Sequence, residues 1–160
     1  MTNEKGFGRT GVDVQTSVER RASSISRLNT LIETRTETLA LLNQLIGMRP
    51  FDGGEGMLAL LQEFCESLVD YTASAHFQLY RFIEEGHERR ADVRTVAEEV
   101  YPRIAGTTRV ILDFNESYES EGLVEDLARL DRDLSRLGEV LADRITEEDK
   151  IISVLIQARA

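Results

Sequence analysis

The chain has 160 residues, with 19 Lys and Arg against 29 Asp and Glu, and a formal charge of −10 at pH 7. This length suits one domain, and a hydrophobic content of 41% is enough to fill a core, which argues against wholesale disorder. Phosphate backbones are bound by Lys and Arg, so the acid surplus argues against sequence-independent nucleic-acid binding and favours a basic partner surface.

The composition also excludes several further classes of protein. The single cysteine, Cys65, cannot form an internal disulfide and fits a reducing cytosol. Two histidines and one cysteine are too few for a Cys/His-rich zinc site. The apolar runs are too short to span a membrane, and the first residues lack the apolar segment of a signal peptide. We therefore expect a cytoplasmic protein without a metal or another cofactor.

The first predicted helix covers residues 14–46, after a polar, glycine-dotted stretch over residues 1–13 that we expect to be a flexible tail. The remainder, residues 14–160, is expected to form a single domain. Apolar residues recur in the helix every seven positions, which indicates one buried stripe. The stripe consists of Val18, Ile25, Ile32, Leu39 and Ile46, with Val14, Leu28 and Leu42 in a companion phase. Arg21 and Arg35 interrupt the companion phase. Their charged groups are expected either to extend to solvent at the edge of the buried stripe or to pair with carboxylates there.

A turn over residues 47–54 separates this helix from a second predicted helix over residues 55–85, with Gly86 at its end. The apolar stripe of the second helix consists of Leu61, Cys65, Leu68, Ala75, Leu79 and Phe82. A third apolar series covers residues 93–118. Pro102 lies inside this series, so we expect either a kink or a short helix followed by a longer one.

The last helix is predicted to begin at Leu123, where leucines recur by fours and threes. The series consists of Leu123, Leu127, Leu130, Leu134, Leu137 and Leu141, and Ile145, Ile152 and Leu155 continue it with a phase shift. No segment shows the alternation of a strand. Long amphipathic helices with short connections favour an all-α fold, an antiparallel up-and-down four-helix bundle.

Patterns typical of catalysis are weak in this sequence. A di-iron bundle needs two Glu-x-x-His pairs on different helices, and the single formal match joins Glu84 to His87 beside Gly86. Cys65 lies on an apolar stripe in acidic surroundings, which disfavour the reactive thiolate. We therefore expect a binding protein and no enzyme, and keep a metal-dependent bundle oxidase as the third hypothesis.

Two charged residues fall at core positions of the last helix. Arg144 and Glu148 stand where the leucine series would place apolar residues, and His76 falls beside the stripe of the second helix. In one interpretation, a phase shift after Leu141 turns Arg144 and Glu148 to the rim as an i, i+4 ion pair. In the other, His76 or Arg35 meets Glu148 in a buried polar layer that fixes the register of the bundle. We favour the rim, because incompletely satisfied buried layers are costly.

A docking surface is indicated on the second helix. Asp70, Phe77 and Arg81 are spaced to share one face, and Glu66 adds a further acid to the same helix. An exposed aromatic ring beside an acid suits a basic partner. The alternative is that Phe77 packs against a neighbouring helix.

Residues 64–80 read Phe-Cys-Glu-Ser-Leu-Val-Asp-Tyr-Thr-Ala-Ser-Ala-His-Phe-Gln-Leu-Tyr and resemble the signature of the Rsd/AlgQ family, regulators of the primary sigma factor. Two shorter similarities follow in the same order, over residues 101–114, which begin Tyr-Pro-Arg-Ile, and residues 137–150, which begin Leu-Gly-Glu. There are two departures. Ala75 replaces the signature glycine, and Asn29-Thr30-Leu31-Ile32 stands where the family commonly carries Asp-Arg-Trp-Leu.

The resemblance implies an all-helical anti-sigma factor that binds the C-terminal promoter-reading domain of the primary sigma factor. Sequestering that domain would lower holoenzyme formation and favour alternative sigma factors. Asp70 matches the aspartate of the signature and is expected to contact sigma, together with Phe77, Glu66 and Arg81. We expect a monomer or weak homodimer that binds neither nucleic acid nor membrane directly. The alternative function is an acidic helical adaptor for another cytosolic regulator or enzyme.

Overall fold

The computed structural model describes residues 7–80, 83, 90–120 and 122–157, and for residues 7–18 and 20–25 it describes the backbone alone. The elements are α1 (Phe7–Ile46), α2 (Glu55–Ala75), the π-helical turn η1 (His76–Tyr80), α4 (Ala91–Tyr118) and α5 (Leu127–Gln157). No strand occurs within these ranges, and the predicted all-α class is confirmed for them.

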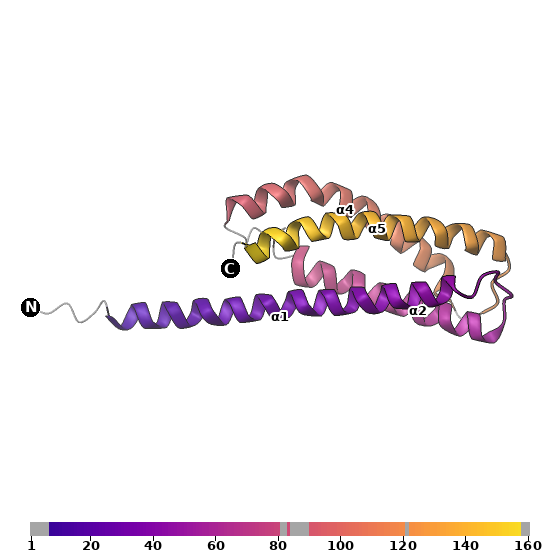
Figure 1. Ribbon diagram of the computed structural model, residues 1–160, viewed down its shortest axis with the longest axis horizontal. Helices are drawn as coiled ribbons and strands as arrows, with labels where there is room; N and C mark the ends of the chain where they lie inside the picture. Colours follow the sequence, from indigo (N-terminus) through magenta and orange to yellow (C-terminus); the bar gives the residue numbers. More distant parts are fainter. Residues whose placement is uncertain (1–6, 81–82, 84–89, 121, 158–160) are drawn as a thin grey trace, which may run out of the picture.

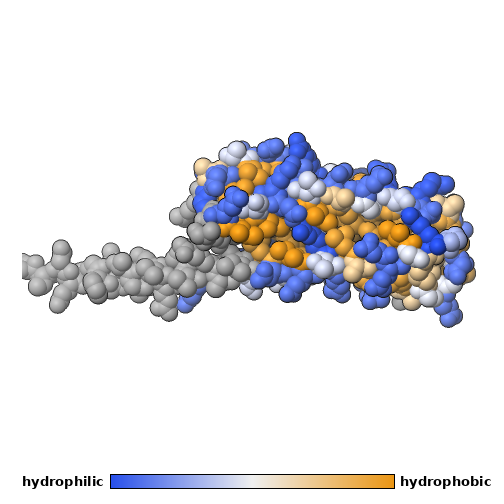
Figure 2. Space-filling view, in the orientation of Figure 1, coloured by the Kyte–Doolittle hydropathy of each residue, from blue (hydrophilic) through white to orange (hydrophobic). Residues whose placement is uncertain are grey.

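The helices lie side by side along one axis (Figure 1). The chain runs along this axis in α1, returns in α2, and runs out and back again in α4 and α5. α1 packs mainly on α2, α4 packs mainly on α5, and a contact between α2 and α4 joins the two pairs. In the space-filling view, hydrophobic residues form a band over the middle of the face in view, with hydrophilic residues along its borders (Figure 2).

Helix α1 begins at Phe7, earlier than the predicted Val14, and its N-terminal part extends beyond the other helices (Figure 1). Residues 7–13, which were expected to belong to a flexible tail, therefore have a helical backbone. Residues 1–6 lie outside the described residues, and their flexibility stays a prediction.

The buried stripe of α1 follows the predicted companion phase, since Leu28 and Leu42 are buried, and not the main predicted stripe. Among the described side chains, the buried residues are Leu28, Leu31, Thr38, Leu42 and Leu45, with Leu41 alongside, and the partly buried Arg35 stands between Leu31 and Thr38. The predicted core residues Ile32, Leu39 and Ile46 are only half-buried. The Thr38 hydroxyl lies 2.8 Å from that of Ser67 on α2, so two small side chains meet where α1 packs on α2.

The buried stripe of α5 has no phase shift, so that part of the prediction is wrong. One series of core residues recurs by fours and threes without a break: Leu130, Leu134, Leu137, Leu141, Arg144, Glu148, Ile151 and Leu155. Glu147 and Ile152 are buried beside this series, so the predicted core residues Ile152 and Leu155 are confirmed, whereas Ile145 is only half-buried. The helix begins at Leu127 instead of Leu123 because Asp126 caps it, accepting a hydrogen bond of 2.9 Å from the Arg129 backbone N–H. Leu123 is 82% exposed and lies outside the core.

The second and third helices differ from their predictions at particular points. Regular α-helix ends at Ala75, and the chain continues as η1, whereas the sequence predicted one helix over residues 55–85. The predicted end at Gly86 lies outside the described residues. α4 runs through Pro102 without interruption, so the alternative of two separate helices is wrong. Its ribbon bends in Figure 1, as expected where proline removes a backbone hydrogen bond.

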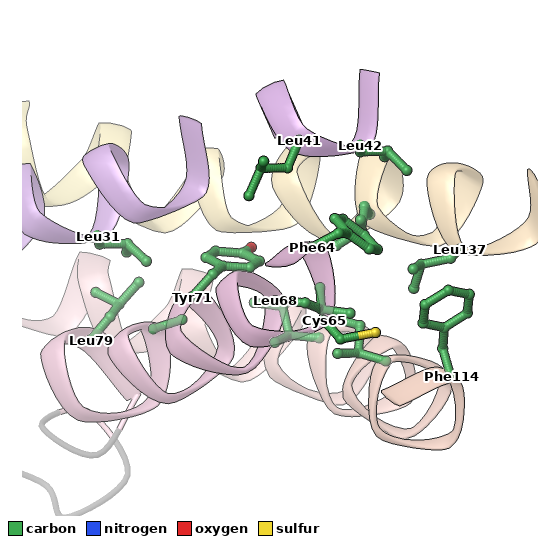
Figure 3. Close-up of a cluster of buried hydrophobic side chains, with 14 of the residues drawn as sticks. Leu31, Leu41, Leu42, Phe64, Cys65, Leu68, Tyr71, Leu79, Phe114 and Leu137 are labelled. Carbon is green, nitrogen blue, oxygen red and sulfur yellow. The ribbon is translucent and has the colours of Figure 1, made fainter. Parts of the chain in front are cut away.

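The core is a continuous set of aliphatic and aromatic side chains from all four α-helices (Figure 3). Towards one end, Phe64 meets Phe114 edge to face, with ring centroids 6.0 Å apart, close to Leu137. Towards the other end, Leu31 and Leu79 lie beside the ring of Tyr71. The Tyr71 hydroxyl is a polar group inside this apolar core.

The leucines predicted for the stripe of the last helix include both buried and exposed residues in the structure. We expect Leu134→Ala to lower the free energy of unfolding by roughly 2–5 kcal/mol, because Leu134 is fully buried and its removal leaves a cavity. Leu123→Ala, the same change at an exposed site, should alter it by no more than about 0.5 kcal/mol. Urea denaturation of both variants measures the difference, and equal losses would contradict the described start of α5.

Candidate functional site

A buried carboxylate stands at the centre of the bundle. Glu148 on α5 has no exposed surface. Tyr71 of α2 donates a hydrogen bond of 2.6 Å to its Oε1, and Tyr80 of η1 donates one of 2.6 Å to its Oε2. The guanidinium groups of Arg144 and Arg35 lie 3.3 Å and 3.5 Å from the same carboxylate. We call these five residues, Arg35, Tyr71, Tyr80, Arg144 and Glu148, the polar layer.

Arg144 is the second charge of the polar layer and is also buried, with 1% of its surface exposed. Its Nε donates to the Tyr71 hydroxyl (3.2 Å) and to Glu148 Oε2 (3.3 Å). Its Nη1 donates to the hydroxyls of Thr107 (3.2 Å) and Thr108 (2.7 Å) on α4. The guanidinium carbon lies 5.5 Å from the ring centroid of Tyr71 and 5.7 Å from that of Tyr80, within cation–π range.

The charges in and beside the polar layer balance. Arg35 forms a second ion pair of 2.8 Å with Asp149, so two guanidinium groups face two carboxylates. Burial alone would lower the pKa of Arg144, but its interactions with Tyr80, Tyr71 and Glu148 raise it above the ordinary value. Burial raises the pKa of the Tyr71 and Tyr80 hydroxyls far above the ordinary range, and the charge of Glu148 raises it further. Both arginines therefore stay charged, and both tyrosines stay neutral hydrogen-bond donors.

This geometry corrects the interpretation that placed Arg144 and Glu148 at the rim, since both are buried. The alternative, in which Arg35 meets Glu148, is correct, whereas His76 is exposed and lies outside the polar layer. Sequence reasoning missed Tyr71 and Tyr80. Their signal was present, because two aromatic hydroxyls beside the apolar stripe of the second helix need buried partners.

A surface groove between α2 and α4, here called the α2/α4 groove, lies directly over the polar layer. One section has a volume of about 310 Å³, and its lining residues include Val69, Phe77 and Leu112 at the surface, and Tyr80 and Arg144 from the layer. An adjoining section of similar size has an acidic lining. Its lining residues include Glu66, Asp70 and Glu119. Val69 and Asn115 line both sections, so the apolar and acidic parts form one continuous surface.

Asn115 contributes an unused acceptor to the α2/α4 groove. Its Nδ2 donates a hydrogen bond of 2.8 Å to Glu119 Oε2, and this fixes the amide orientation because a carboxylate can only accept. Its Oδ1 is buried and has no hydrogen-bond partner. A buried acceptor without a partner carries an energetic cost that a hydrogen-bond donor would relieve.

The predicted docking residues lie together at this groove as far as they are described. Asp70 and Glu66 are exposed on its acidic side. Phe77 is 58% exposed on its apolar side, and whether it contacts the partner stays a prediction. His76 lines the same section, and its ring centroid lies 5.3 Å from that of Phe77. Arg81 lies outside the described residues, and its role stays a prediction.

The described residues give little support for a metal site, a reactive cysteine or a membrane-spanning helix. Among its residues, no group of three or more His, Cys, Asp and Glu side chains is placed to hold a metal ion. Burial raises the pKa of the Cys65 thiol to about 12, which disfavours the reactive thiolate. None of the helices within these residues combines the length and the apolar character needed to cross a membrane.

The structure is that of an acidic, all-helical protein with a partly apolar, partly acidic groove between α2 and α4. The profile of the family described as regulator of RNA polymerase sigma(70) subunit, Rsd/AlgQ, matches residues 12–156, and the chain belongs to this family. A protein of Enterobacter sp. (strain 638) named "Regulator of sigma D" is 30% identical over 148 residues, covering 89% of this chain and 88% of that protein. Proteins of the same name from Shigella boydii serotype 4 and Escherichia coli O139:H28 are 29% identical, each covering 88% of this chain and 90% of the relative. No solved structure matches the chain.

Removing the central charge of the polar layer should destabilise the fold strongly. Glu148→Gln keeps the size of the side chain but leaves the buried Arg144 without its counter-ion. We expect a loss of roughly 3–5 kcal/mol in the free energy of unfolding, measured by urea denaturation. Glu139→Gln, the same change at an exposed position of α5, is the control and should have little effect. A loss of less than about 1 kcal/mol for Glu148→Gln would show that the buried pair contributes no more than a surface pair.

The buried tyrosines should make the protein sensitive to alkaline pH. An unfolded tyrosine ionises near pH 10, whereas the raised pKa of Tyr71 and Tyr80 keeps both protonated in the folded state. The free energy of unfolding therefore keeps its full value below about pH 10. Above that pH it falls by about 1.4 kcal/mol per pH unit for each of the two tyrosines. Urea denaturation at pH 9 and pH 11 should differ by roughly 3 kcal/mol from these two residues.

The double variant Tyr71→Phe/Tyr80→Phe is the control for this alkaline effect. It lacks both hydroxyls, so it should be less stable at pH 9 and lose much less of its remaining stability between pH 9 and pH 11. An equal loss in the double variant and the unmodified protein would contradict the prediction. Normal ionisation of all tyrosines near pH 10 in the folded protein, followed by absorbance at 295 nm, would contradict it as well.

Proposed function

We propose that the protein is a cytoplasmic anti-sigma factor that binds the C-terminal promoter-recognition domain of the primary sigma factor and sequesters it. Sequestration lowers the amount of housekeeping holoenzyme and so shifts transcription towards alternative sigma factors. The scaffold is an antiparallel up-and-down four-helix bundle, and the α2/α4 groove with η1 is the proposed docking site. Family membership supports a sigma partner, and the chemistry of the groove supports this particular surface.

The observation that carries the proposal is the pairing of exposed carboxylates with exposed apolar side chains along one groove. Asp70 and Glu66 present negative charge to solvent on one section. Val69, Phe77 and Leu112 present apolar surface of 44%, 58% and 53% exposure, respectively, on the other. A domain that binds DNA carries a basic face, and such a face suits this acidic rim. The apolar side chains supply the anchor that charge alone does not.

The α1 residues that depart from the family pattern do not line the α2/α4 groove, so the departure is compatible with docking there. Leu31 stands at the position of the family's tryptophan and is fully buried, beside Tyr71 and Leu79 in the core (Figure 3). The replacement therefore changes core packing and leaves the α2/α4 groove untouched. Asn29 and Thr30 are exposed on α1, which does not line the groove.

The direct test is binding to the isolated C-terminal sigma domain, measured by co-elution at moderate salt and by titration calorimetry. We expect a complex at micromolar concentrations, with an affinity that falls as salt is raised because charge steers the association. No complex at these concentrations would overturn the sigma assignment. Recovery from a lysate of a different basic protein, without sigma, would support the alternative of an acidic adaptor.

Asp70 is expected to contribute directly to this binding. Asp70→Ala should weaken the affinity by roughly 1–3 kcal/mol if its carboxylate pairs with a sigma arginine in a desolvated contact. Glu139→Ala removes an exposed carboxylate of α5 that does not line the groove, and it should leave the affinity within about twofold. Equal effects of the two substitutions would show that net charge, and not this site, governs binding.

A further inference from the structure

The π-helical turn η1 joins the docking surface to the polar layer. It is the only departure from α-helical geometry within the described helices, and it begins directly after the buried Ala75. Its first two residues, His76 and Phe77, are exposed and line the α2/α4 groove. Its last residue, Tyr80, is buried and belongs to the polar layer. Five consecutive residues thus connect the surface with the central carboxylate.

The far end of η1 is held from two helices. The Tyr80 hydroxyl donates to Glu148 of α5, and the Tyr80 ring lies beside the Arg144 guanidinium. From α4, the Tyr101 hydroxyl donates to the Tyr80 backbone carbonyl, and the two rings meet with centroids 5.5 Å apart. A π-turn is less stable than α-helix of the same sequence, so contacts outside the turn are needed to maintain it. Tyr80 supplies or receives each of these contacts.

We propose that the polar layer positions the docking surface, with Tyr80 as the positioning residue that sets the place of Phe77 relative to Asp70. A π-turn inserts an extra residue, so its relaxation to α-helix would rotate the residues on one side of it against those on the other. Asp70 lies before η1 in regular helix, whereas Phe77 lies inside η1. The spacing of the acidic and apolar contacts therefore depends on the bond between Tyr80 and Glu148. The inference rests on the proposed function, because the surface it positions is the proposed docking site.

The layer contains a matched control for this inference. Tyr71 and Tyr80 are both buried, and each donates a 2.6 Å hydrogen bond to one oxygen of Glu148. Replacing either by phenylalanine removes one hydroxyl from the same acceptor, and both changes should lower stability. Only Tyr80 lies in η1, since Tyr71 is in the regular part of α2. A purely structural role predicts similar effects on binding, whereas a positioning role predicts different ones.

The first experiment measures the affinity of Tyr80→Phe and Tyr71→Phe for the isolated C-terminal sigma domain, at a temperature where both variants are folded. We expect Tyr80→Phe to weaken binding by about tenfold and Tyr71→Phe to stay within about twofold of the unmodified protein. Equal weakening by both variants, or unchanged affinity of Tyr80→Phe, would overturn the proposal.

A double-mutant cycle tests whether Tyr80 acts through Phe77. Phe77→Ala should weaken sigma binding by itself, and adding Tyr80→Phe to this variant should cause little further loss, because the side chain being positioned is already absent. Additive losses would mean that Tyr80 affects binding by another route and would overturn this part of the inference.

Hydrogen exchange of the free protein separates the inference from the proposed function. In Tyr80→Phe, the backbone amides of residues 76–80 should exchange faster than in the unmodified protein, while those of residues 57–68 change little. Tyr71→Phe should leave the exchange of η1 unaltered. Unchanged exchange in η1 of Tyr80→Phe would overturn the positioning role even if sigma binds. Faster exchange without any sigma binding by the unmodified protein would support the positioning of η1 and reject the proposed partner.

Discussion

The bundle depends on how one buried negative charge is neutralised. Taking the Glu148 carboxylate out of water costs several kcal/mol, and the cost is offset only where partners surround it in good geometry. Those partners come from α1, α2, η1 and α5, so each segment has to present its side chain at the same level along the axis. Aliphatic packing tolerates small slips between helices, whereas this set of hydrogen bonds does not. We therefore expect the polar layer to fix how far each helix is shifted along the axis relative to the others.

Much of this fold could be predicted because helical periodicity is local. The four long helices, the leucine series of α5 and the absence of strands among the described residues all follow from apolar spacing. The phase of α1 could not be settled in this way, because two overlapping apolar series compete. In the structure the series with Leu28 and Leu42 is buried, and Thr38 on the same side contacts Ser67 of α2. Such a contact joins two helices that are distant in sequence, so it cannot be predicted from the apolar spacing within either helix alone.

The candidate site shows the same division between local and non-local information. The exposed face of α2 with Asp70 and Phe77 was visible in the spacing and in the family signature, and both residues lie at one groove. The burial of Arg144 and Glu148 was judged wrongly, because α5 alone offers no sign that two tyrosines and a second arginine satisfy the charge. η1 was also missed, since a π-turn has no distinct apolar period.

The pairing of Arg144 with Glu148 in the polar layer has a consequence for how such a sequence can change. An all-aliphatic layer of similar volume would be comparably stable or more so, since buried ion pairs seldom exceed apolar packing in stability. Reaching it one substitution at a time, however, means passing through chains in which Arg144 or Glu148 is buried alone. Each intermediate would carry an uncompensated charge in the core. Single substitutions at Arg144 or Glu148 are therefore expected to be disfavoured, even where a fully apolar layer would be as stable.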